Sequence, residues 1–216
     1  MEKLETKKDL LSKLRAYSNS PDDENILYKK KIEKALLSNP CLLYALNENT
    51  LESELFDDDG KNINWEWNDD LGEYEPLGEW DRYFGSNSNI RPFLFIPDTQ
   101  TEVKHYICYQ VAFDESPRYN DTLKYTNITF TIFVHGNDRM DKLTGIPRHD
   151  LIASIIRERF NWSNIFGMQT HLISSKESVT DNNYLVRTLV FQVVDPNGFY
   201  KTTNGKTAVN NYMLRR

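Results

Sequence analysis

The sequence ITFTIFVHGNDRMDKLTGIPRHDLIASIIRERF, residues 128–160, lies at the centre of the stretch that decides the fold. Apolar residues first alternate along Ile128–Val134, which predicts a half-buried strand. They then recur at helical spacing along Ile146–Phe160, with a proline at the first turn. This helix is expected to bury one face, made of Leu151, Ile152, Ile155, Ile156 and Phe160. A strand followed by an amphipathic helix predicts two packed layers.

Further alternating segments lie on both sides of this centre. Val103–Phe113 precedes it, and Met168–Ser174 and Tyr184–Val194 follow it. Arg91–Pro97 is apolar and bounded by proline, which favours an edge strand. The segments together predict an α+β fold: a mostly antiparallel sheet of about four to five strands, with one long helix packed on it. Residues 91–194 form the predicted core domain.

Two polar connections in this core are candidates for contact with a partner. His135–Gly145 is expected to be a loop, and Ser174–Asn183 a protruding hairpin tip. Their charged side chains are the candidate interface residues Arg139, Asp141, Lys142, Lys176 and Glu177.

Residues 1–47 predict a small helical lobe in front of the core. A helical stripe covers residues 3–17, a second helix starts near Pro21, and Cys41–Leu46 adds a short third turn. The second helix is expected to bury Ile26, Leu27, Ile32, Leu36 and Leu37.

Residues 48–90 form an acidic, aromatic-rich segment. Between Glu48 and Asp81 there are thirteen acidic residues and a single Lys61, interleaved with aromatic rings. A solvating acidic linker would contain few aromatics. Two interpretations stay open: an insertion folded on its own domain, or an interaction arm that can line a channel. The candidate contact residues here are Trp65, Trp67 and Trp80.

Residues 195–216 form a basic tail without hydrophobic periodicity, typical of a mobile chain end. Alternatively, the tail becomes ordered on a neighbouring subunit, where Tyr212 and Leu214 would help to add an edge strand.

Composition excludes several classes of protein. The 216-residue chain has a net charge of −6, which argues against a non-specific nucleic-acid coat. No window reaches the ~20 apolar residues of a membrane helix, and the N-terminus has no signal-peptide core. Cys41 and Cys108 give no disulfide framework, and each is expected to be a small buried apolar residue.

No motif carries a convincing chemistry, so neither a cofactor nor a catalytic residue is expected. The four histidines, His105, His135, His149 and His171, lack the spacing of zinc ligands. Residues 57–66 resemble a calcium loop, but Leu55 occupies the first ligand position, where a carboxylate is required.

Asp98, Glu102 and Lys104 resemble the residues of a PD-ExK nuclease, in which the two acids hold a metal ion and the lysine stabilises the developing charge. Only three residues separate the two acids, where such enzymes place a hairpin's length.

The segments LTGIPRHDLIASIIR, residues 143–157, and YLVRTLVFQV, residues 184–193, resemble those of structural proteins of tailed bacteriophages. The chain is most similar to the tail terminator or head–tail joining class. That resemblance implies a small α/β subunit forming a ring, usually a hexamer, that caps the tail tube and docks on the neck or head-completion protein below the portal. DNA would pass through its bore without specific contacts, and no catalytic residues would be carried over. The helical lobe and the acidic segment depart from the compact form of the family.

The sequence therefore predicts a non-enzymatic, ring-forming virion protein at the head–tail interface, made in the host cytoplasm and with no membrane contact. An acidic bore would repel the DNA phosphates and let the genome slide. Two alternatives stay open: the PD-ExK nuclease, and an acidic adaptor that binds a basic partner.

Overall fold

The computed structural model describes residues 6–17, 24–46, 65–76, 88–97, 103–113, 123–180, 183–196, 200–201 and 207–208. Its helices are α1 (Lys7–Tyr17), α2 (Glu24–Leu37), α3 (Pro40–Ala45), α5 (Arg148–Phe160) and the short 3₁₀ helix η2 (Gly136–Asp138). Its strands are β1 (Trp65–Asn68), β2 (Glu73–Pro76), β3 (Ile90–Arg91), β4 (Tyr106–Phe113), β5 (Leu123–His135), β6 (Thr170–Val179), β7 (Tyr184–Pro196), β8 (Tyr200–Lys201) and β9 (Thr207–Ala208).

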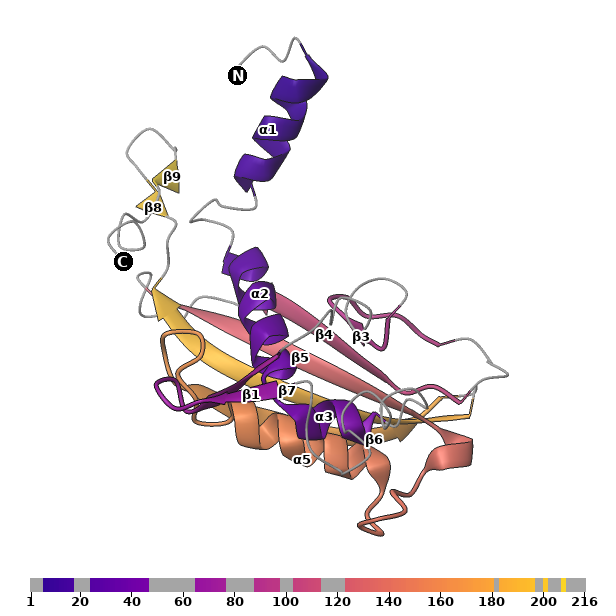
Figure 1. Ribbon diagram of the computed structural model, residues 1–216. Coiled ribbons are helices and arrows are strands. Elements are labelled where there is room, and N and C mark those ends of the chain that lie inside the picture. Colours follow the sequence, from indigo (N-terminus) through magenta and orange to yellow (C-terminus); the bar gives the residue numbers. More distant parts are fainter. Residues whose placement is uncertain are drawn as a thin grey trace.

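The main sheet has five strands in the order β3-β4-β5-β7-β6. The short β3 runs parallel to β4, and every other neighbouring pair is antiparallel. Two hairpins, β4–β5 and β6–β7, are therefore joined by α5, which carries the chain over β7 to the far edge (Figure 1). This arrangement confirms the predicted α+β fold, with a mostly antiparallel sheet and α5 packed on it, but the slightly longer α2 packs on the same sheet.

One face of the sheet carries the main hydrophobic core. Alternate residues of β4, β5 and β7 meet three helices there, because a strand directs every second side chain to the same face. The fully buried members are Ile32, Leu42, Leu43, Ile90, Ile107, Ile128, Phe130, Ile132, Val134, Ile152, Ile156, Phe160, Phe191 and Val193. On α5 the predicted Leu151 and Ile155 are half-buried, and the helix begins at Arg148, with Pro147 just before it.

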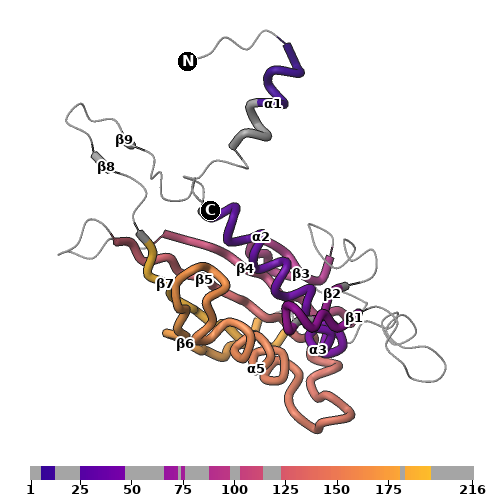
Figure 2. The backbone as a smooth tube through the Cα atoms, turned by 60° about the vertical axis from the view of Figure 1, so that its left-hand side comes forward, coloured from indigo at the N-terminus to yellow at the C-terminus, as the bar shows by residue number. Residues whose placement is uncertain are grey.

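Helices α2 and α3 share this core instead of forming a lobe with a core of their own. The buried stripe of α2 is Tyr28, Ile32, Ala35 and Leu36, at the spacing of one helix face. The predicted Ile26, Leu27 and Leu37 flank that stripe and are half-buried. Among the described helices, α1 stands apart from the sheet in both views (Figures 1 and 2).

The opposite face of the sheet holds a smaller buried cluster. It consists of Tyr106, Cys108, Phe133, Tyr184 and Val186. Phe95 packs against this cluster, and the Arg91 guanidinium lies 3.6 Å from the centre of the Phe95 ring. The predicted strand Arg91–Pro97 is therefore wrong for most of its length: only Ile90–Arg91 pair with β4, and the following residues fold over the sheet.

Several other predictions need correction. Ser174–Val179 continues β6 because it pairs with β7 as far as Leu185, so the predicted tip shrinks to residues 180–183. Its polar residues resemble a loop in sequence because an edge strand exposes much of its surface. Strand β5 extends from Leu123 to His135, beyond the predicted bounds at both ends. Cys108 is buried as expected, whereas Cys41 lies exposed on α3.

Two small antiparallel pairs complete the described residues. Strands β1 and β2 form a hairpin in the acidic segment, in which Gly72 adopts a positive φ of 62° at the turn. Strands β8 and β9 pair within the basic tail. Within the described segments, every helix is too short or too polar to cross a membrane.

Candidate functional site

A short protruding loop between β5 and α5, residues 139–147, is built as a closed unit, which we call the finger. A bridge joins Met140 to Pro147 across its base. The Asp141 amide donates to the Ile146 carbonyl at 2.9 Å, and the Gly145 amide donates back to the Asp141 carbonyl at 2.9 Å. Gly145 has a positive φ of 68°, a conformation that glycine adopts without steric cost. The finger is therefore fixed by its own backbone bonds.

Asp141 is an internal part of the finger, although its sequence suggested a contact residue. Its side chain is buried, and its Oδ2 accepts hydrogen bonds from the Thr144 amide at 2.8 Å and the Thr144 hydroxyl at 2.7 Å. Burial opposes ionisation, but the bonds from Thr144 and the charge of Arg148 outweigh it, so the pKa of Asp141 is lowered. The Asp141 carboxylate thus links the two sides of the loop through Thr144.

Arg148, the first residue of α5, ties the finger to the body of the molecule. Its guanidinium is fully buried and donates to Asp138 Oδ1 at 3.1 Å and to the Ala45 carbonyl at 3.0 Å. Asp141 Oδ1 lies 3.5 Å from the same guanidinium. A buried charge is tolerated only when it is paired and hydrogen-bonded, and these partners meet that requirement. One side chain therefore joins the finger, η2 and the end of α3.

His105 extends this buried network to the sheet. Its Nδ1 accepts the His135 amide at 3.1 Å, so Nε2 carries the proton and donates to Asp138 Oδ2 at 3.0 Å. Burial lowers the pKa of His105, and the attraction of Asp138 only partly offsets that effect. The imidazole is therefore neutral, with both ring nitrogens used.

The outer surface of the finger is apolar and basic. Leu143 is 77% exposed, and Met140 and Ile146 are also largely exposed. Arg139 and Lys142 are exposed beside them. The Arg139 Nε donates to the Gly136 carbonyl at 2.7 Å, which orients the guanidinium. A rigid loop that holds three apolar side chains in water is a feature of contact surfaces.

The two connections predicted as contact loops meet at the same end of the sheet. The Gly136 amide donates to the Asn183 carbonyl at 2.8 Å. A Cβ on Gly136 would lie 2.2 Å from the Asn183 side-chain oxygen, so a larger residue there requires the Asn183 side chain to move. The structure thus places Asn183, just before β7, directly against the start of η2.

Lys176 and Glu177 lie on β6, not on a hairpin tip. Both are exposed, and Glu177 Oε1 lies 3.2 Å from Nε2 of the buried His149. Arg187 Nη1 lies 3.5 Å from the other Glu177 oxygen and 3.4 Å from Asp150. These contacts tie the outer strand to the start of α5. In the described part of the chain, the outer edge of β6 pairs with no other strand.

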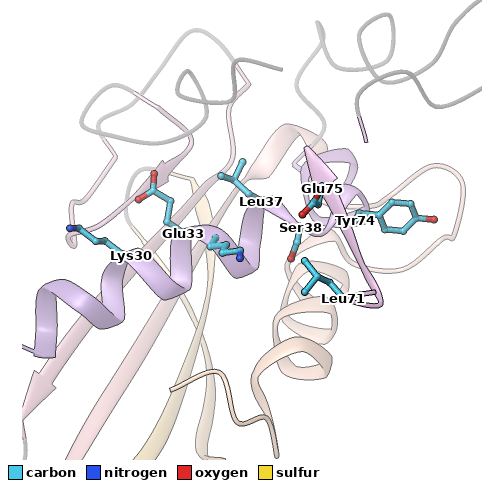
Figure 3. A pocket seen from close by; sticks show the side chains of 8 residues that line it. Lys30, Glu33, Leu37, Ser38, Leu71, Tyr74 and Glu75 are labelled. Atoms are coloured by element: carbon cyan, nitrogen blue, oxygen red, sulfur yellow. The ribbon is translucent and has the colours of Figure 1, made fainter. Parts of the chain in front are cut away.

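A groove of about 400 Å³ lies between α2 and the β1–β2 hairpin (Figure 3). Helix α2 and the residue after it contribute Lys30, Glu33, Lys34, Leu37 and Ser38, and the hairpin contributes Leu71, Tyr74 and Glu75. Leu71 is 56% exposed, and Tyr74 is partly exposed beside it. The groove is therefore open, and both apolar and charged side chains line it.

The hairpin next to the groove carries exposed aromatic rings and acids. Trp67 is 51% exposed, packs edge-on against Tyr74 at 5.0 Å between centroids, and donates from Nε1 to Asp69 at 2.8 Å. Trp65 is paired opposite Pro76 at the start of the hairpin. The predicted insertion therefore contains a two-stranded element whose rings stay accessible.

Other predicted positions lie outside the described residues. They are Trp80, Tyr212, Leu214, the acids Asp98 and Glu102, and residues 57–64 of the calcium-like loop. Lys104 is described and is half-buried. In the described part of the chain, no group of three or more histidine, cysteine or acidic side chains could hold a metal ion.

Comparison with protein-family models assigns this chain to a family. The family model named YomW matches residues 39–193, more than half of the chain. The protein belongs to the YomW family. This family name derives from a Bacillus phage protein, so the match is consistent with a phage origin for this chain. A comparison with curated proteins gave no match.

The region matched to YomW contains the sheet, α5, the finger and the hairpin. Sequence reasoning missed the roles of Asp138 and Arg148, because a charged residue near a helix start usually faces solvent. It also missed the groove, which combines two segments far apart in the chain. For the finger, the sequence offered one signal: the apolar residues Met140, Leu143 and Ile146 lie within an otherwise polar loop.

Proposed function

We propose that this YomW-family protein is a structural virion protein of a tailed phage. It would form a ring, of six subunits on the resemblance stated above, as a tail terminator or head–tail joining subunit. The ring would link the tail tube to the neck and leave a channel for DNA. The phage-derived family supports the setting, and the finger is the observation that carries the role in assembly.

The finger supports a role in assembly because it has a fixed conformation although its apolar side chains are exposed to water. Buried ion pairs and backbone bonds hold it in one conformation, yet Leu143, Met140 and Ile146 face water. Burying such side chains against another subunit recovers roughly 25 cal/mol per Å² of apolar surface. Because the loop is already ordered, that burial carries little cost in conformational entropy.

A second candidate function is an adaptor that binds a basic partner, favoured by the exposed Trp67 and Tyr74 among acids. Aromatic rings beside carboxylates can bind a cationic segment through stacking and charge. Tight binding of one basic host protein to a monomer would favour this reading over the ring.

Localisation in virions tests the proposed position. Gold-labelled antibodies against this chain should bind purified particles at the junction of head and tail. Label confined to the head shell or the tail tip, or none on intact and gently disrupted particles, would contradict the proposal.

A further inference from the structure

We infer that neighbouring copies of this chain join head to tail, with the finger of one copy seated in the α2–hairpin groove of the next. This inference rests on the proposed ring and names the surfaces that build it. The carrying observation is that one chain holds an exposed apolar projection and a matching apolar groove at two separate places.

The two surfaces lie at opposite ends of α5. Arg148, at its first residue, holds the finger through Asp138 and Asp141. Arg159, near its last residue, donates to Ser38 in the groove wall at 3.2 Å. At 1.5 Å of rise per residue these two positions are roughly 17 Å apart along the helix. A finger fixed at one end therefore does not fill the groove of its own chain, so a finger seated in that groove would belong to another copy.

The two surfaces also match in chemistry. The finger offers Leu143, Met140 and Ile146, and the apolar residues that line the groove are Leu37, Leu71 and Tyr74. Burial of aliphatic side chains against leucine and tyrosine is the usual centre of a protein interface.

The charges around these apolar centres are complementary. Arg139 and Lys142 are the exposed charges of the finger. The hairpin wall of the groove lies in residues 65–76, which contain five acidic residues and no basic ones. The opposite wall carries Lys30 and Lys34 with Glu33, so it repels the finger's cations and directs them to the hairpin. The charges thus fix the orientation of the finger in the groove.

Such a contact uses two different surfaces, so it is heterologous and continues from copy to copy until the ring closes. An isologous contact would instead stop at a dimer. A ring needs the heterologous kind, which the placement of finger and groove supplies.

The test uses the full chain with the exposed Cys41 changed to serine. Leu143→Glu removes the finger contact and Leu71→Glu removes the groove contact, and both positions are exposed enough to keep the fold. Ile96→Glu is the matched control, since Ile96 is 68% exposed but belongs to neither surface. We expect each test variant to weaken the subunit contact by about 30-fold or more, and the control to assemble as the parent does.

Mixing the two variants gives the sharper result. The Leu143→Glu chain keeps its groove and the Leu71→Glu chain keeps its finger, so an equimolar mixture should form a heterodimer and stop there. Native mass spectrometry measures the masses. Full-sized oligomers from the mixture, or two variants that each assemble normally, would overturn the inference.

Cross-linking provides a readout that does not depend on affinity. A chain with Leu143→Cys and Leu71→Cys should form a ladder of disulfide-linked oligomers on oxidation, and a chain with Leu143→Cys and Ile96→Cys should not. If the parent chain forms rings but no ladder appears, the finger–groove contact is wrong and the proposed function stands. If the parent chain is a monomer at every concentration, both fail.

Discussion

Arg148 shows how much of the molecule one side chain can organise. Its buried guanidinium contacts the finger, η2 and the last residue of α3. Removing one partner of such a buried pair is strongly destabilising, because a charge is left unpaired. The rigidity of the finger therefore originates in residues that a contact partner never touches.

At Gly136 we predict that substitution by alanine lowers the free energy of unfolding by about 1 kcal/mol or more, the lower range for overpacking. The new methyl group would overlap the Asn183 side chain, which must move aside. Urea denaturation measures the change. In an Asn183→Gly background the same substitution should cost much less, because the clashing side chain is gone and glycine suits the φ of 63° at that position. An equal cost in both backgrounds would contradict the predicted clash.

At His105 we predict a pH-dependent loss of stability. Its pKa is lowered in the folded protein, so its contribution is fully present above its ordinary pKa of about 6.5 and is lost as the pH falls below that value. The unfolded chain then binds a proton that the folded chain does not. One such group can change the free energy of unfolding by at most about 1.4 kcal/mol for each pH unit.

The free energy of unfolding should therefore fall from pH 7.5 to pH 5.5, and less so in His105→Gln. His171→Gln, at a half-buried histidine on β6, serves as the control. The same pH slope in wild type and His105→Gln would contradict the assignment of a neutral, fully hydrogen-bonded imidazole.

At the scale of elements, the finger is a preformed unit that depends on the Asp141 carboxylate. We predict that Asp141→Ala lowers the free energy of unfolding by about 1–3 kcal/mol, since the Thr144 donors and Arg148 lose an acceptor. Amide hydrogen exchange at Thr144 and Gly145 should accelerate as well. Lys142→Ala, on the exposed side of the same loop, should change stability by less than about 0.5 kcal/mol. Unchanged exchange in Asp141→Ala would show that the backbone alone holds the loop.

The elements also show what the sequence could predict. Strands β4, β5 and β7 and helix α5 followed from alternation and helical spacing, because their apolar residues face one core. The length of β6 did not follow, since an edge strand with polar faces resembles a loop. The packing of α2 and α3 on the sheet did not follow either, because the stripe Tyr28-Ile32-Ala35-Leu36 fits a separate lobe equally well.

The candidate site was partly predictable in the same way. Arg139 and Lys142 were found from their loop and are exposed on the finger. Asp141 came from the same pattern but is buried, because charge in sequence does not reveal whether a loop folds back on its own carboxylate. The groove is formed by α2 and a hairpin that is distant in the chain, and no local sequence pattern contains such a pairing.

At the scale of the whole molecule, the protein carries several surfaces suited to contact with other chains. The sheet has an unpaired outer strand among its described strands, and the finger and groove lie at opposite ends of α5. If copies of the chain assemble as proposed, assembly adds to the stability of each subunit. Its stability should consequently rise with protein concentration.

The most direct test is the native mass of the purified full-length chain. The proposed finger–groove contact predicts one closed assembly of identical subunits, with six times the 25.4 kDa chain mass if the ring is a hexamer. The Leu143→Glu variant should give single chains instead. A protein that stays a single chain across the whole concentration range would contradict it.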